Sequence, residues 1–333
     1  MPIVASELKL MRSASVSNTA ASNGGRFGTA EVVSAVNNNI FPDVTQAERT
    51  SGLTSFRKVF HRNINAADLS LLNPRVFLEN YTGANDAVVF HAGSQVDLQS
   101  DLTGSELLFG AGKLDASVSA GATSITVLLE SSSIQFFRNG DKIRISDRAT
   151  IDAVGNEEFA LISGTPSLVG SVVTLTLGTA LQNNFNASNT RVANVYEPAA
   201  VEATVSNIVV NTAGNGDYNN AGAPIDAHNV GSEYDDWTLT FTSSTAFNCV
   251  GTREGSAGSG STLADFAPVN PATSTPYFTV LSAGFTGVWA SGDTLVFRTN
   301  PAAVPIWLKR VVPAATAAFS ANKFFLALDG ETA

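Results

Sequence analysis

Alternation of apolar and polar residues with a period of two dominates the middle of the chain. The clearest case is Lys142–Ser146, where two isoleucines alternate with polar residues directly after a Gly-Asp turn. Four more runs rich in β-branched or apolar residues surround it: Thr123–Leu129, Phe159–Ile162, Val172–Leu177 and Arg191–Tyr196. Strands at a spacing of roughly 10–15 residues, separated by turn signals, are typical of a sandwich or barrel. The pattern therefore predicts a small β-sandwich or barrel module over residues 116–198.

A second β module is predicted over residues 199–333. Its predicted strands are Thr204–Val210, Trp237–Phe241, Pro276–Leu281, Thr294–Thr299 and Ile306–Val312. Between them lie two stretches rich in Gly, Asn and Ser, Asn211–Gly222 and Gly251–Gly260, whose composition predicts loops. Loops of this kind are either mobile or ordered by a neighbour.

Residues 1–115 are predicted to form an N-terminal arm and a β assembly region. Ser13–Gly28 has the Ser, Asn and Gly content of a flexible arm or loop, and Thr29–Val36 is a weak candidate for a short helix. Strands are expected near residues 3–11 and at Phe56–Phe60, Arg75–Leu78 and Val88–Phe90. Taken together, the chain is expected to be mainly β, with two or three sandwich or barrel modules, an extended arm and little helix.

Two segments of the chain resemble each other. Phe136–Ile145 and Trp289–Phe297 each place an aromatic residue before a Gly-Asp turn that opens an alternating strand. Gly-Asp is also a common hairpin turn. The sequence alone therefore leaves open whether a β module has been duplicated.

Composition adds a second kind of information, because the chain is poor in ionic residues. Charged residues make up 14% of its 333 residues, with a formal net charge of −10, against roughly 25% charged residues in ordinary globular proteins. A hydrophobic content of 44% excludes general disorder, and the acidic balance argues against a dedicated binder of nucleic acid or anionic membranes. Interface centres are depleted of Lys, Glu and Asp, so we expect a subunit covered in an assembly. The alternative is a secreted β-protein with a Thr-rich surface.

The cysteine count and the hydropathy pattern bear on compartment. A single cysteine, Cys249, excludes an internal disulfide and a multi-cysteine metal site, and its alternating apolar surroundings favour a buried residue. The first residues, Met1–Glu7, show no signal-peptide pattern, and no apolar run approaches the roughly 18 residues of a membrane helix. We expect a protein that is made in a cytoplasm, with no insertion into membranes.

Motifs that would indicate catalysis or metal binding were sought among the polar residues. The three histidines, His61, His91 and His228, are far apart in sequence and lack metal-site spacing, and the Gly-rich run 255–260 lacks the Lys-Ser/Thr ending of a phosphate loop. Oxygen ligands for Ca²⁺ are offered by Asp217, Asn219 and Asp226 in the loop region 211–226, but a solvated turn is the favoured interpretation.

Two acid doublets and three tryptophans complete the candidates. Neighbours on a strand face opposite ways, so Glu157-Glu158 and Asp235-Asp236 are not expected to present paired carboxylates. Core positions are favoured for Trp237, Trp289 and Trp307. We therefore predict no catalytic, cofactor-binding or metal site and no enzymatic activity. A polysaccharide-cleaving enzyme is kept as an alternative, which Asp235→Ala and Glu158→Ala would test.

Several segments resemble virion structural proteins of tailed bacteriophages with Mu-like gene sets. They are the opening Ile3–Leu10 with the Ser/Asn/Gly arm that follows, Phe56–Asn63 with Asn73–Leu78, and the closing segments Gly292–Ala303 and Ile306–Pro313. The resemblance spans most of the chain and implies a tail tube subunit as the first choice. Such subunits assemble in the host cytoplasm into stacked rings, usually hexamers, within the virion tail.

The resemblance also implies partners. They would be further copies of the chain, other phage tail proteins, and DNA that passes through without sequence-specific binding. A ring of six copies would carry a charge of about −60, which lets DNA slide rather than adhere. The alternatives are a baseplate or receptor-binding tail protein, which would use loops 211–222 and 251–260, and a capsid decoration or neck protein.

Overall fold

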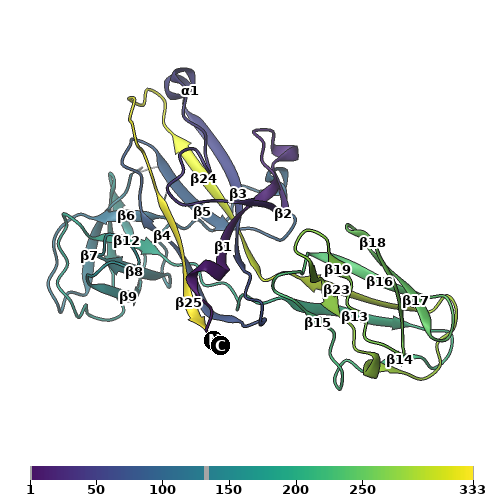
Figure 1. The fold of residues 1–333 in the computed structure, drawn as a ribbon. Helices are drawn as coiled ribbons and strands as arrows, with labels where there is room; N and C mark the ends of the chain where they lie inside the picture. The colour runs from purple at the N-terminus through teal and green to yellow at the C-terminus, as the bar shows by residue number, and fades with distance from the viewer. Residues whose placement is uncertain (1, 131–134, 333) are drawn as a thin grey trace.

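The computed structural model describes residues 2–130 and 135–332. Strands account for 46% of the structure and helices for 6%, which confirms the predicted mainly-β class with several modules and little helix. Figure 1 shows three lobes: a central lobe built from both ends of the chain, which we call the base, and one β module on either side of it. No helix of the described residues is long and apolar enough to cross a membrane.

The base is a five-stranded antiparallel sheet in the order β2-β1-β3-β24-β5. Its strands are β1 (Leu8–Ser15), β2 (Gly24–Glu31), β3 (Leu53–Asn63), β5 (Ala87–Ala92) and β24 (Ala303–Val312). A separate antiparallel ladder joins β4 (Leu71–Asn80) to β25 (Phe325–Thr332). Val76 and Leu78 of this ladder share one core with Val59, Phe90 and Ile306 of the sheet. The ladder therefore covers one face of the sheet, which explains why both sets of strands are rich in apolar residues.

The C-terminal residues belong to the base, which corrects the predicted extent of the last module, 199–333. β24 pairs with β3 along its whole length, from Ala303 opposite Arg62 to Val312 opposite Leu53, and β25 pairs with β4. Period-two alternation shows which face of a strand is buried, but it does not identify a distant partner strand. Ile306–Val312 is therefore predicted from sequence to belong with its neighbours along the chain, whereas its partner strands lie in the base.

The N-terminal region differs from the prediction in two places. Ser13–Gly28 is not an extended arm: β1 and β2 pair as a hairpin that spans most of it, with bulges between Met11 and Ser15. The candidate helix at Thr29–Val36 does not form, because its first residues end β2. The helical segments are instead η1 (Ala5–Glu7), η2 (Ala20–Ser22), α1 (Gln46–Ser51), η3 (Gln99–Asp101) and η4 (Ser282–Gly284).

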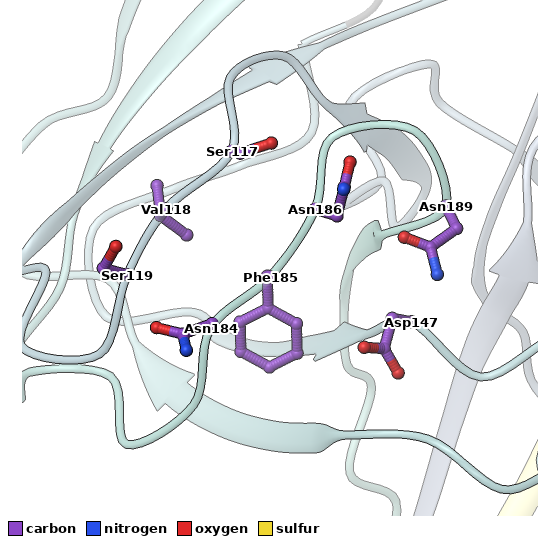
Figure 2. A pocket seen from close by; sticks show the side chains of 8 residues that line it. All are labelled: Ser117, Val118, Ser119, Asp147, Asn184, Phe185, Asn186 and Asn189. Atoms are coloured by element: carbon purple, nitrogen blue, oxygen red, sulfur yellow. The ribbon is translucent and has the colours of Figure 1, made fainter.

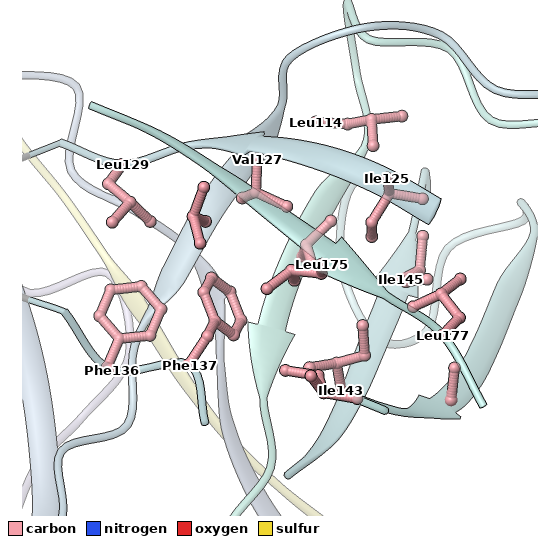
Figure 3. Close-up of a cluster of buried hydrophobic side chains, with 14 of the residues drawn as sticks. Leu114, Ile125, Val127, Leu129, Phe136, Phe137, Ile143, Ile145, Leu175 and Leu177 are labelled. Atoms are coloured by element: carbon pink, nitrogen blue, oxygen red, sulfur yellow. The ribbon is translucent and has the colours of Figure 1, made fainter. Parts of the chain in front are cut away.

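The lobe that follows β5 is a closed barrel, which we call the barrel module (residues 109–196). Its strands are β6 (Ala111–Leu114), β7 (Ser124–Leu128), β8 (Lys142–Ser146), β9 (Glu157–Leu161), β10 (Ser167–Val169), β11 (Val172–Thr176) and β12 (Arg191–Asn194). They follow the order β10-β11-β7-β6-β12-β8-β9, and a bridge between Ile162 and Leu177 joins β9 to β11. Ile143, Ile145 and Val127 point into its core (Figure 3) and are fully buried. The predicted barrel alternative is thus observed, starting slightly earlier than residue 116.

The remaining lobe, which we call the third module (residues 203–300), is built on a second five-stranded sheet. Its order is β13-β23-β16-β17-β18, formed by β13 (Thr204–Asn211), β16 (Asp235–Phe241), β17 (Ala246–Gly251), β18 (Gly255–Ser261) and β23 (Thr294–Asn300). Three short ladders accompany it: β14 (Asp217–Tyr218) with β22 (Phe285–Thr286), β15 (Asp226–Ala227) with β21 (Phe278–Thr279), and β19 (Val269–Asn270) with β20 (Thr275–Pro276). An aromatic core that includes Trp237, Phe278 and Phe297 lies between the sheet and the ladders.

One predicted loop of this module is a strand. Gly251–Gly260 was expected to be a loop, but Gly255–Ser261 forms β18 and pairs with β17. Gly258 has a φ of +100° next to a break in the register, a conformation that glycine adopts without steric cost. The backbone hydrogen bonds come from β17, so the ladder forms despite the low strand propensity of glycine.

The two similar segments noted in the sequence have the same turn geometry. Gly140 and Gly292 both have positive φ, at +86° and +97°. In each turn the aspartate after the glycine accepts a backbone N–H from three residues earlier, at 3.0 Å for Asp141 and 2.8 Å for Asp293. The aspartate side chain therefore fixes both turns and starts the strand that follows.

Candidate functional site

The sequence-level candidates do not converge on one site. His61 is fully buried, and burial lowers its pKa to about 4; burial also lowers the pKa of His91. Asp217 and Asp226 lie in different ladders, and the Asn219 carboxamide accepts the Gly222 N–H at 3.1 Å. Among the described residues, no group of three or more His, Cys, Asp or Glu side chains is arranged to hold a metal ion.

The acid doublets point to opposite sides, as predicted. Asp235 is fully buried and accepts backbone N–H groups, whereas Asp236 forms a two-pronged ion pair with Arg298, with both distances at 2.8 Å. Glu157 pairs with Arg144, while Glu158 accepts the backbone N–H groups of Gln182 and Asn183. All four carboxylates therefore already have structural partners. The predicted burial of Cys249 and the three tryptophans is also confirmed.

A charged cluster joins the base to the third module, and we call it the junction. Arg26 of β2 forms ion pairs with Glu254 and, at 3.8 Å, with Glu233. Tyr277 donates its hydroxyl to Glu254 at 3.3 Å. Arg62 of β3 donates to the carbonyl groups of residues 229 and 230 at 3.2 Å each. Charged side chains of the base thus contact polar groups of the third module and link the two lobes.

A second contact across the same boundary links Asp68 to His228. His228 Nδ1 lies 2.8 Å from Asp68 Oδ2, and Nε2 lies 2.9 Å from Thr279 Oγ1. An acid, an imidazole and a hydroxyl in this order also occur in nucleophilic relays. Here Asp68 accepts the backbone N–H of Asn229 at 2.7 Å as well, and Thr279 belongs to the β15–β21 ladder. The contact is therefore assigned to holding the two lobes together.

Burial raises the pKa of Glu233 to about 7, although Arg26 and Arg62 oppose the shift. A glutamate in an unfolded chain titrates near 4.3, so the folded protein holds this proton over a pH range where the unfolded chain releases it. The contribution of this bound proton to the free energy of unfolding is complete below about pH 4.5 and is lost as the pH rises through 7. The junction should therefore be weaker at alkaline pH.

We expect Glu233→Gln to remove this pH dependence. In urea unfolding between pH 5 and pH 9, the wild type should lose about 3 kcal/mol of stability relative to the variant as the pH rises, an upper figure from the shift in pKa. The charged groups that face Glu233 are Arg26, Arg62, Asp235 and Glu254, and all remain in the variant. Glu202→Gln, at an exposed position, is the control. If the unfolding free energies of wild type and Glu233→Gln changed with pH in parallel, the raised pKa of Glu233 would not be the source of the pH dependence.

The base also contains a fully buried lysine, which sequence reasoning did not single out. Lys58 Nζ donates to Asp97 Oδ1 at 2.5 Å and to the carbonyl of Gly25 at 2.7 Å. Trp307 Nε1 donates to the other carboxylate oxygen of Asp97 at 2.7 Å. The cluster ties β2, β3 and β24 to the loop after β5. Nothing in the local sequence marks this burial, because Lys58 stands next to Arg57 in a strand that also contains His61 and Arg62.

A polar cavity of about 340 Å³ opens at one end of the barrel module (Figure 2). Its lining consists of Ser117, Val118, Ser119, Asp147, Asn184, Phe185, Asn186 and Asn189. Several polar groups are already occupied: Asp147 accepts the Asn156 N–H at 2.6 Å, and the Asn184 carboxamide accepts the Ala120 N–H at 2.9 Å. The cavity therefore offers few free hydrogen-bonding groups to a ligand.

Uncharged sheet edges are the most distinctive feature of the surface. β10, β13 and β18 are edge strands, and none contains a charged residue. Edge strands of soluble proteins usually carry lysine, another charge or proline, which prevent pairing with other chains. Large apolar side chains are exposed at all three edges: Val169 of β10 at 77%, Val209 of β13 at 49%, and Leu263, just after β18, at 79%.

The chain matches no protein-family model and no curated protein sequence.

Proposed function

We propose that this chain is a structural component of a tailed bacteriophage particle, and that it works by assembling with copies of itself. The first arrangement we propose is the tail tube, in which stacked rings, usually hexameric, conduct DNA. The sequence resemblance to virion proteins of phages with Mu-like gene sets suggested this class. The mainly-β fold and the uncharged sheet edges support it.

The observation that carries the proposal is where the few charges lie. Five of the nineteen basic residues are buried, namely Arg57, Lys58, Arg62, Arg144 and Arg310. Two of them, Lys58 and Arg62, hold loops and lobes together through the contacts described above, and Arg144 pairs with Glu157 on the neighbouring strand. The solvent-facing surface is therefore even poorer in cations than the sequence indicates, and isolated soluble proteins normally present mixed charges there. Depletion of lysine is one feature that such a surface shares with interface centres.

A second candidate is an external baseplate or decoration subunit. Two modules project from opposite sides of the base (Figure 1), and the barrel module carries an open polar cavity at its end. Projecting modules suit a protein that displays surfaces on the outside of a particle. Both candidates require self-association or docking on a virion, and they differ in copy number.

Sedimentation velocity over a concentration series, followed by electron microscopy of the purified chain, tests the proposal. We expect reversible growth into discrete oligomers, and rings or tubes of uniform diameter if the chain is a tube subunit. Labelling of virions with an antibody against the chain should then mark the length of the tail. Labelling of one end or of the capsid would favour the second candidate. A protein that stays monomeric at high concentration and labels no virion would overturn both.

A further inference from the structure

The outer edge of β18 is open to another strand. Thr262 donates to the carbonyl of Thr245 at 2.8 Å, and the next pair is Ala246 opposite Ser261. Because bonded and non-bonded pairs alternate in an antiparallel ladder, the backbone groups of Ser259 point away from β17. Ser259 is exposed, and β18 is the last strand of its sheet. The N–H and the carbonyl of Ser259 therefore face outward along this edge.

Apart from one register shift, this edge lacks the features that normally block pairing. β18 reads Gly-Ser-Ala-Gly-Ser-Gly-Ser and has no charge, no proline and no bulky side chain. A register shift opposite Val250 leaves Gly258–Ser261 as the regular part of the strand. Beside it, Leu263 is 79% exposed and Val250 is 48% exposed. Exposed apolar side chains thus flank both ends of this unpaired backbone edge, and a covering strand would bury them with it.

The charge distribution leaves the β18 edge as a surface through which two copies of this acidic module can meet. Residues 203–300 contain eight acidic and two basic residues, a net charge of −6, and like-charged modules repel each other except where they meet through uncharged surface. A cationic partner would bind the acidic surface rather than this strand. Serine hydroxyls and backbone groups both donate and accept, so the edge is complementary to itself.

We propose that β18 pairs antiparallel with β18 of a second copy of this chain. A two-fold axis would then join two five-stranded sheets into one continuous sheet, with Leu263 of each copy packed beside the new pair. The inference rests on the proposed function and names one contact of the assembly. A two-fold contact closes on itself, so rings would need a second, heterologous contact elsewhere on the chain.

Two variants attack this contact in different ways. Ser259→Pro removes an N–H that points away from β17, so the internal ladder keeps its bonds. Leu263→Glu places a like charge beside the two-fold axis. Ser259→Ala keeps the backbone N–H and serves as the control for the first. Val154→Glu, at a fully exposed position of the barrel module, introduces the same charge elsewhere.

Sedimentation velocity with circular dichroism as a folding check is the measurement. We expect Ser259→Pro and Leu263→Glu to weaken self-association at least about tenfold and both controls to associate like the wild type. Hydrogen exchange should show the Ser259 amide protected in the wild-type oligomer and unprotected in Leu263→Glu. If the wild type assembles and both variants assemble equally well, the β18 contact is wrong while the proposed function stands. If the wild type does not assemble, both fail.

Discussion

Asp97→Ala is expected to destabilise the base by about 3–5 kcal/mol, the cost of leaving a buried charge without its partner. Lys58 has no exposed side-chain surface, and burial lowers the pKa of its ammonium group. The nearby Asp97 carboxylate opposes this shift because it favours the charged ammonium. Removing the carboxylate also leaves the Trp307 indole N–H without its acceptor. Urea unfolding at neutral pH measures the loss directly.

The double variant Lys58→Met/Asp97→Leu is the informative control. Replacing a buried ion pair by apolar residues of similar volume is often neutral or stabilising, so the double variant should recover a large part of the stability lost in Asp97→Ala. A loss below 1 kcal/mol in the single variant would show that water reaches Lys58. A double variant as unstable as the single one would show that packing, rather than charge, dominates at this position.

Strands buried on one face were predictable from sequence. Lys142–Ser146 is β8 to the residue, because its isoleucines alternate with polar side chains and a Gly-Asp turn marks its start. Thr294–Thr299 is likewise β23 apart from one residue. In both cases local residues alone determine the direction of the side chains and the position of the turn.

Features that depend on distant partners were not predictable. β24 follows the third module directly along the chain, yet it pairs with β3 and β5. β18 has the composition of a loop and becomes a strand only because β17 supplies its hydrogen bonds. Lys58 resembles a surface residue in the sequence, and only the fold places Asp97 beside it. Each of these features is set by long-range pairing, which no local pattern encodes.

The charge deficit connects the fold with the proposed function. Charged side chains that would normally face water are used for internal contacts, such as Arg62 at the junction and Lys58 in the base. What remains outside is largely Ser, Thr, Asn and Gly, together with unprotected sheet edges. This combination supports the proposal that the chain assembles with copies of itself.

Asp235→Ala is expected to destabilise the third module by about 3 kcal/mol or more, since each buried N–H left without an acceptor costs about 1–3 kcal/mol. The Asp235 carboxylate is fully buried and accepts the backbone N–H groups of Arg253 at 3.0 Å and Glu254 at 2.8 Å. These residues form the turn that leads into β18. The variant should therefore show faster amide exchange in Gly255–Ser261 and weaker self-association.

Asp236→Ala provides a matched control on the adjacent residue. Asp236 makes a partly exposed ion pair with Arg298, and such pairs contribute about 1 kcal/mol or less. The loss of unfolding free energy, measured with urea, should therefore be severalfold larger in Asp235→Ala than in Asp236→Ala, although each variant removes one carboxylate. Equal losses would mean that the turn before β18 does not depend on Asp235. Asp235→Ala could also lower the free energy of unfolding strongly while amide exchange in β18 stays unchanged. The carboxylate would then stabilise the core of the module without ordering the edge strand.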